Sequence, residues 1–484
     1  MARGSKKERN GKRVRNLFVR KVVTTVCLLW GLLDVRAATS GSSDGKGSDL
    51  AKHESWRDCL ADQGVTFSAE WDANVFANVR GGIERRAETD GLIKLGLDLD
   101  FQKITKLCFF NDTDIHVEGY YPYGTNISNY VGDLPGVNND AAYNSPRLYE
   151  LWAQKGFTFG IVDCSVRTGL LAADQEFYLN NTAALFINSS FGASLAFGGN
   201  APIPVYPFAA LAVRLDFSVG DAKNLKVNFR TGVYDGNSAA PTLGPFAVGA
   251  PASISYNKYG VDFHLNPSTG LIFLNEVAFS FLNHEAPENP ANGPARWFIG
   301  PGHVVIGGFY ASNQFKSIYQ AQLQDVGALE PPAQVRHIAG DYGVYAIWEQ
   351  KLYEDAPYSP NGLFIFGRGL LLPDDRNFDT LSAETGAVYR GVFRRQKDSQ
   401  DSLGIGLAYN YISNRVRNAD SFAKREGFPG VLNYEFESVL EATYAFPVSG
   451  HWQLQPDLQL VVRPGGAGSY RNALVIGLRS ILAF

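Results

Sequence analysis

One segment of the chain combines the side chains that bind a hydroxyl-rich ligand. It reads DQEFYLNNTAALFINSSFG over residues 174–192 and carries Asp174, Glu176 and Asn188 among phenylalanines and a tyrosine. Carboxylates and amides exchange hydrogen bonds with hydroxyl groups, and an aromatic ring packs against the apolar face of a sugar ring. The composition therefore suits a polar, uncharged ligand such as a sugar. The alternative is an ordinary loop that its aromatic residues hold against the rest of the fold.

Further charged residues occur at alternate positions within apolar segments. Glu150 and Trp152 share one face of RLYELW (147–152), and Arg167 in the next segment would lie opposite them. Other candidates, chosen by parity or by position, are Arg214, Arg368, Glu435, Glu437, Glu441, Asp457, Arg463 and Arg479. Opposite charges across a water-filled pore would orient polar, uncharged solutes. Simple solvation of a wall that faces water explains many of these residues one by one, but the three glutamates within 433–446 are too densely placed for that reading alone.

A histidine lies among acidic residues in FNDTDIHVEGYY (110–121). Asp112, Asp114, His116 and Glu118 would share one face of a strand, and such residues can bind a divalent ion. Neighbouring side chains on one strand face lie about 7 Å apart, which is too wide for one coordination shell. We therefore favour the lining of a water-filled lumen, and we expect no metal site and no cofactor.

The sequence does not support an enzyme. Its seven histidines are scattered, and neither a G-x-S-x-G nor a G-x-x-x-x-G-K-[ST] motif occurs. A barrel hydrolase with His and Ser on its outer face, or an adhesin that uses external loops, remains the weakest of our alternatives.

Strict alternation of apolar and polar residues predicts the strands that would position these side chains. In 433–446 the even positions run from Tyr434 to Phe446 and are apolar except for Ser438, whereas the odd positions include the three glutamates. Segments 452–464 and 472–484 alternate in the same way. The apolar faces begin and end in aromatic residues, as in a membrane barrel with aromatic girdles. A soluble sandwich is the alternative, but three carboxylates on the opposite face suit a water-filled lumen better than a packed interior.

The bulk properties agree with a closed antiparallel transmembrane β-barrel. The chain has 484 residues, a net charge of -4, 13% aromatic residues and 50 glycines. No apolar run reaches the roughly 18 residues of a spanning helix. The residues from position 56 onward would form about 16 strands of 9–11 residues, with 18 as the alternative count. If the chain ends in the periplasm, 447–451 forms a periplasmic turn and 465–470 an external one.

The N-terminus predicts export. Basic residues, an apolar core at 22–33 and the V-x-A site at 35–37 form a secretory signal peptide over residues 1–37. Residues 38–55 would be a flexible leader, and 56–484 the barrel. Of the remaining cysteines, Cys108 and Cys164 could pair in an oxidising periplasm, but isolated thiols are favoured.

Long ordered motifs resemble one family. GLFIFGRGLLLPDDRNFD (362–379), DSLGIGLAYNYIS (401–413) and RTGLLAADQEFYLNNTAALFINSSFG (167–192), with the final strand, are similar to segments of the carbohydrate-selective outer-membrane porins (OprB-like). The resemblance covers most of the chain after the leader. It departs at 54–67, where the family usually has a glycine-rich WGG turn, and at the Pro/Gly-rich stretch 284–303, which we interpret as an enlarged external loop.

The resemblance implies a barrel, often of 16 strands, in the outer membrane of a Gram-negative bacterium. Mono- or small oligosaccharides would diffuse passively through it into the periplasm, and an inward-folded loop near 172–192 would narrow the channel. It further implies that Phe484 is read by the insertion machinery, while monomer and homo-oligomer both stay open. A non-specific diffusion pore is the main alternative, and no nucleic-acid partner is expected.

Overall fold

The computed structural model describes residues 56–221, 223–236, 257–263, 265, 269–282, 296–297, 299–329, 335–396 and 399–484. The predicted signal peptide (1–37) and leader (38–55) lie outside these described residues, so both stay predictions. Among the described residues, no helix is both long and apolar enough to cross a membrane.

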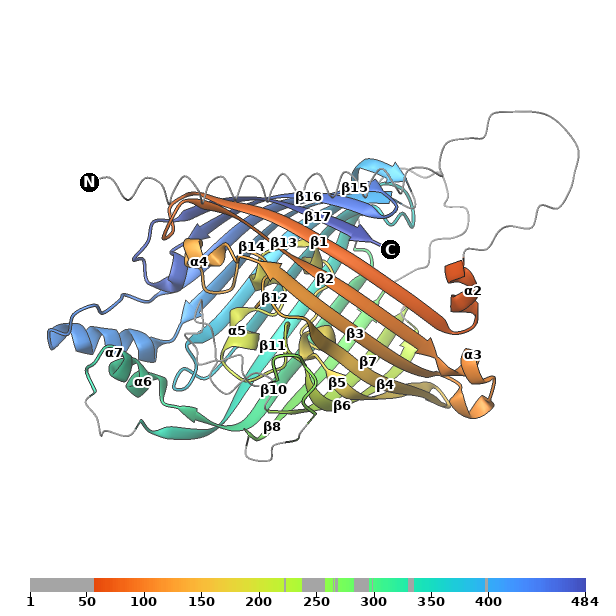
Figure 1. Ribbon diagram of the computed structural model, residues 1–484, viewed down its shortest axis with the longest axis horizontal. Helices are drawn as coiled ribbons and strands as arrows, with labels where there is room; N and C mark the ends of the chain where they lie inside the picture. Colours follow the sequence, from red (N-terminus) through yellow and green to blue (C-terminus); the bar gives the residue numbers. More distant parts are fainter. Residues whose placement is uncertain are drawn as a thin grey trace, which may run out of the picture. The chain divides into compact units, whose positions relative to one another are not determined.

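Strands dominate the chain from residue 65 onward (Figure 1). They are β1 (Val65–Arg80), β2 (Arg86–Asp100), β3 (Thr113–Gly124), β4 (Arg147–Phe159), β5 (Val162–Leu171), β6 (Ala210–Asp221), β7 (Leu225–Asp235), β8 (Leu271–Phe281), β9 (Arg296–Trp297), β10 (Gly302–Lys316), β11 (His337–Glu354), β12 (Gly362–Leu371), β13 (Asp379–Gln396), β14 (Ser399–Ile412), β15 (Phe436–Ser449), β16 (Trp452–Val462) and β17 (Ala473–Ala483).

Short helices occupy the connections between strands. They are α2 (Trp56–Asp62), α3 (Phe101–Thr105), α4 (Ser128–Val131), α5 (Leu195–Gly199), α6 (Ile318–Asp325) and α7 (Asn414–Arg425), with 3-10 turns η2 (Cys108–Phe110), η3 (Ala173–Gln175), η4 (Ala183–Leu185), η5 (Ser189–Phe191) and η7 (Pro464–Gly466). Figure 1 shows α6 and α7 at one rim of the barrel and α3 at the opposite rim.

The sheet closes on itself. Each strand pairs antiparallel with its neighbours, β8 pairs with β10, and β1 pairs with both β2 and β17. The two-residue β9 pairs only with the end of β11, so 16 strands form the wall. Closure gives the backbone N–H and C=O groups of every strand a partner strand, which a sheet in lipid requires. The predicted barrel is confirmed, with the count of 16 rather than 18.

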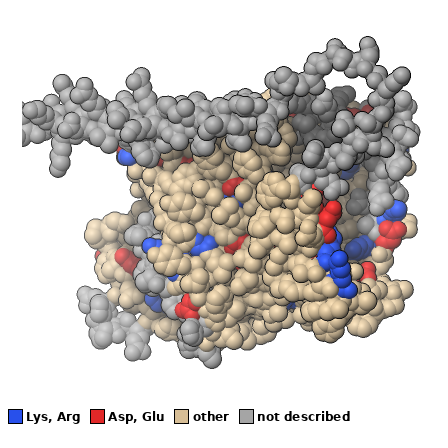
Figure 2. All heavy atoms as spheres, turned by 45° about the vertical axis from the view of Figure 1, so that its right-hand side comes forward, with Lys and Arg blue, Asp and Glu red and all other residues tan. Residues whose placement is uncertain are grey.

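Alternation along each strand separates an inner from an outer face. In β15 the inward Glu437, Val439 and Glu441 are fully buried, while the outward Leu440 is 44% exposed. Other outward side chains on the wall are likewise apolar and exposed, including Val75, Leu95, Val213, Phe229, Leu458 and Ile476. In Figure 2 uncharged side chains predominate on the visible face and charged groups are few.

Strand direction bears on the predicted loop at 284–303. Trp452 pairs with Leu482, so the turn before β16 lies at the barrel end where β17 finishes. Following the alternation of directions, Phe281 and its partner Gly302 lie at that same end. If that end faces the periplasm, as predicted for the C-terminus, the chain leaves β8 and enters β10 on the periplasmic side, which argues against an external loop at 284–303. Its length and its Pro/Gly content suggested the outer side, but the parity of the preceding strands determines the side. Most of the stretch lies outside the described residues.

Two connections at the opposite end fold into the barrel. The β3–β4 loop (125–146) and the β5–β6 loop (172–209) contribute most of the largest buried side chains that are not on strands, among them Phe177, Phe186 and Phe197. On β14 the inward Gly404 and Gly406 make room for them, because a Cβ built at Gly406 would lie 2.8 Å from the ring of Phe191. These two glycines therefore leave the space that side chains of the β5–β6 loop occupy.

The cysteines of the described part of the chain are unpaired. Cys59, Cys108 and Cys164 are free thiols, so the prediction of isolated cysteines is confirmed.

Candidate functional site

The inward position of the β5–β6 loop depends on carboxylates of the wall. A buried backbone N–H without a partner costs about 1–3 kcal/mol, so a loop that enters a barrel needs acceptors there. Four inward glutamates, named here the wall carboxylates, supply them. Glu150 accepts from the Ala172 N–H at 2.8 Å, Glu276 from Tyr178 at 2.6 Å, Glu349 from Asn181 and Thr182 at 2.9 Å each, and Glu441 from Ile187 at 2.6 Å and Asn188 at 3.0 Å.

Arg368 binds the carbonyl groups of the same loop. Its guanidinium donates to the carbonyl oxygens of Tyr178 at 2.8 Å and Gly192 at 2.7 Å, and to that of Ser190 at 3.2 Å. Glu384 on the neighbouring strand accepts from the Arg368 Nε at 2.6 Å and neutralises the buried charge. The wall therefore binds both the N–H groups and the carbonyl groups of the loop backbone.

The β3–β4 loop is held by Arg479 on β17 and by Glu437 on β15. Arg479 donates to Asn138 at 2.5 Å and pairs with Asp140 at 2.9 Å. Glu437 accepts from the N–H groups of Leu134 at 3.0 Å and Gly465 at 2.7 Å. These two predicted residues thus contact loop backbone and loop side chains inside the barrel.

A cluster of arginines surrounds Glu176 near the start of the β5–β6 loop. The Glu176 carboxylate pairs with Arg167 on β5 and, at 3.0 Å, with Arg214 on β6. Arg230 on β7 donates to the backbone carbonyl of Glu176 and pairs with Asp216 at 2.7 Å. The side chains of Arg167 and Arg230 are 19% and 26% exposed, while Arg214 is buried. We call Arg167, Arg214 and Arg230 the arginine row.

Trp152 continues this row onto β4. Its indole lies 3.7 Å from the Arg167 guanidinium and stacks on His116 with ring centroids 4.9 Å apart. Because β3 and β5 flank β4 on its two sides, these contacts reach the indole from opposite directions. The indole therefore presents an edge rather than a free face, and its Nε1–H donates to Glu150 at 3.2 Å.

A cavity of about 450 Å³ lies between the two inward loops. Its lining includes Lys94, Tyr120 and Arg368 from the wall, together with Asp140 and Asp174 from the two loops. Burial raises the pKa of the Asp174 carboxyl to about 6. The volume falls within the range of small-molecule sites, about 300–1,000 Å³.

The structure sorts the predicted site residues into three groups. The first group lies together around the arginine row, with Asp174 in the adjoining cavity, and consists of Glu150, Trp152, Arg167, Glu176 and Arg214. A second group consists of Arg368, Asn188, Glu437, Glu441 and Arg479, which make loop contacts elsewhere in the barrel. Glu435 precedes β15, is half-buried and pairs with Arg463 at 3.0 Å.

Several residues of the site were missed from the sequence. Arg230 alternates with apolar residues along LKVNFRTGVYD, a pattern that could have placed it inward. Glu276 is a polar residue within the apolar segment LIFLNEVAFSF, but nothing in the local sequence shows that it and Glu349 accept hydrogen bonds from a loop about 100 and 170 positions away in the chain. Asp112 precedes β3 and so does not belong to the face that carries His116.

Comparison with known proteins identifies the family. The family model for carbohydrate-selective porins, the OprB family, matches residues 84–484. The chain belongs to this family. It is 21% identical over 441 residues to Porin B of Pseudomonas aeruginosa, covering 87% of each chain. The high-pH structure of Pseudomonas putida OprB superposes with a TM-score of 0.72 at 21% identity, covering 88% of this chain and 96% of that one, which shows a shared fold.

Membership confirms the predicted function class. The protein is a carbohydrate-selective porin of the Gram-negative outer membrane, a channel rather than an enzyme. Its substrates are sugars that pass through the barrel.

Proposed function

We propose that mono- or small oligosaccharides enter through the cavity between the inward loops and are selected at the arginine row. The observation that carries this proposal is the partial exposure of Arg167 and Arg230 beside Glu176. Guanidinium groups held by carboxylates present donors in fixed directions, and sugar hydroxyls accept from them. Carboxylates beside the arginines offset their charge, which favours a polar, uncharged solute over an ion.

Trp152 has a restricted role in this proposal. Because its faces are occupied by His116 and Arg167, it supports the guanidinium and does not stack on the sugar. Selection then rests on hydrogen bonds more than on aromatic packing.

Single-channel recording tests the proposal. In a planar bilayer we expect added sugar to block the current, and R167A and R230A to weaken that block about tenfold, which equals about 1.4 kcal/mol. The matched control is R415A, because Arg415 lies on α7 with a side chain that is 54% exposed. Sugar block that is equal in R167A and R415A would contradict the site, and current that no sugar affects would favour a non-specific pore.

We also propose that residues 1–37 are cleaved and that residues 38–55 form a leader to the barrel of 56–484. N-terminal sequencing of the mature protein should then begin at Ala38. Retention of residues 1–37 in the mature chain would contradict the cleavage.

Phe484 is the proposed contact with the insertion machinery. The backbone N–H of Phe484 donates to the Ala69 carbonyl at 2.8 Å. Phe484 as a whole is 51% exposed, so its ring is available to a partner. We expect F484A to lower assembly in cells while the purified, refolded barrel keeps its stability. Native mass measurement of the same sample would distinguish monomer from homo-oligomer.

A further inference from the structure

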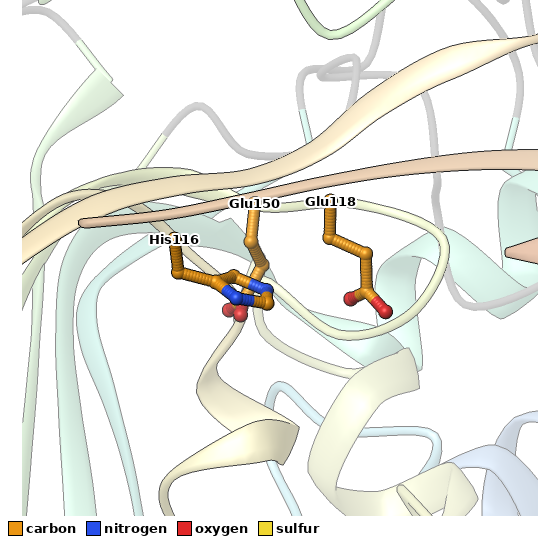
Figure 3. Close-up of side chains that lie close together, drawn as sticks. All are labelled: His116, Glu118 and Glu150. Atoms are coloured by element: carbon orange, nitrogen blue, oxygen red, sulfur yellow. The ribbon is translucent and has the colours of Figure 1, made fainter. Parts of the chain in front are cut away.

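Three potential metal ligands meet on adjacent strands of the wall. His116 and Glu118 lie on β3, and Glu150 is the direct cross-strand partner of Glu118 on β4. One ligand atom from each lies within 4.8 Å of the others, and no other such group of three His, Cys, Asp or Glu residues occurs among the described residues. Figure 3 shows the three side chains extending to the same side of the two strands.

Two of the three ligands are oriented by other residues. The His116 Nδ1 lies 2.6 Å from the Asp98 carboxylate on β2, so the imidazole is held with its Nε2 available. Protein metal sites commonly fix a ligating histidine through a carboxylate in this way. Glu150 is buried and is oriented by the Ala172 N–H and the Trp152 indole, yet each carboxylate oxygen keeps a further lone pair.

We propose that His116, Glu118 and Glu150 bind a divalent ion of the zinc class in the channel wall. One imidazole nitrogen with two carboxylate oxygens suits Zn²⁺ better than Ca²⁺ or Mg²⁺, which prefer oxygen ligands alone. Zn²⁺ bonds of about 2.0–2.2 Å require ligand atoms about 3.3 Å apart, so small side-chain rotations close the site. Three protein ligands leave a fourth position for water or a hydroxyl group from the lumen.

The cross-strand partner removes the objection drawn from the sequence. Side chains on one strand face are about 7 Å apart, but residues directly opposite on neighbouring strands have Cβ atoms about 5 Å apart. The third ligand, Glu150, lies 32 positions after Glu118 in the chain. The register of β3 with β4 places the two residues directly opposite each other. The expectation of no metal site rested on β3 alone.

Titration of the purified full-length barrel with ZnCl₂ tests this site. We expect one Zn²⁺ per chain, with binding lost in H116A and E118Q and weakened about 10–100-fold in D98N, where only the imidazole's partner changes. Ca²⁺ at the same concentration should not compete. E118Q is the more informative carboxylate variant, because Glu150 also accepts from the β5–β6 loop.

H303A is the matched control. His303 also faces the lumen, on β10, where its Nδ1 lies 2.9 Å from the Ser280 hydroxyl and outside the proposed ligand set. Zinc binding that persists in folded H116A, that is lost equally in H303A, or that Ca²⁺ displaces would overturn the proposal. Retained β-sheet circular dichroism identifies the variants that fold, and the zinc readout is independent of sugar conduction.

Discussion

The inner wall differs between its two sides. From β12 to β17 the inward residues include glycine, alanine, valine, glutamine, Phe366 and buried charges that bind the loops, and aromatic side chains of the β5–β6 loop fill the remaining space. From β3 to β7 the inward residues include His116, Glu118, Glu150, Trp152 and the arginine row, and several of these side chains are partly exposed. Inward charges bind the loops on the first side. On the second side Glu150 also binds the β5–β6 loop, and we propose that the partly exposed arginines contact solutes.

Removal of Arg368 should show the largest effect on the supporting side. R368A breaks three hydrogen bonds to loop carbonyls and leaves Glu384 buried without its partner, which costs about 3–5 kcal/mol of unfolding free energy. Urea unfolding of the protein in lipid vesicles measures this loss of free energy. In single-channel recordings the current noise of the open channel should increase. The double variant R368M/E384L should recover stability without restoring a quiet channel. A quiet, fully stable R368A would contradict the supporting role.

Glu441 should give the next largest effect. E441Q leaves one carbonyl oxygen where two carboxylate oxygens accepted from Ile187 and Asn188, so we expect a loss of about 1–3 kcal/mol and a higher conductance. E435Q is the control, because Glu435 is half-buried and pairs only at the rim with Arg463. Equal effects of the two variants would remove the distinction between loop support and surface charge.

Filling the recess on β14 should have an effect of similar size. G406A places a methyl group 2.8 Å from the ring of Phe191, and overpacking of this kind typically costs about 1–3 kcal/mol. In G450A the new methyl group meets nothing within 4 Å, so that variant should unfold like the parent protein. A destabilised G450A together with an unchanged G406A would show that the loop does not occupy the recess.

Arg167 should show the smallest change in stability. R167A leaves Glu176 paired with Arg214 and removes a partly exposed ion pair, so we expect less than about 1 kcal/mol. The same variant should weaken sugar block. On this side of the wall, a change in selectivity would then occur without a comparable change in stability. A loss of stability as large as that of R368A would mean that both sides support the loops.

The sequence predicts faces better than roles. The alternation of apolar and polar residues correctly predicts that Arg479, Glu437 and Glu441 face inward, because every second side chain of a strand lies on the same face. It could not reveal that Glu441 binds residues about 250 positions earlier, since that contact depends on closure of the barrel and on the path of a loop. Trp152 shows the same limit. A tryptophan on an inward face is compatible with stacking on a sugar, and only the structure shows that His116 and Arg167 already lie against its ring.

The seam between β1 and β17 has a consequence for biogenesis. Arg479 and Asn74 form a hydrogen bond across it although they are 405 positions apart in the chain. Until that seam forms, both terminal strands expose unpaired backbone groups that lipid cannot hydrogen-bond. The nascent wall must therefore stay sheltered from the bilayer core, and from other copies of itself, until its most distant strands have met.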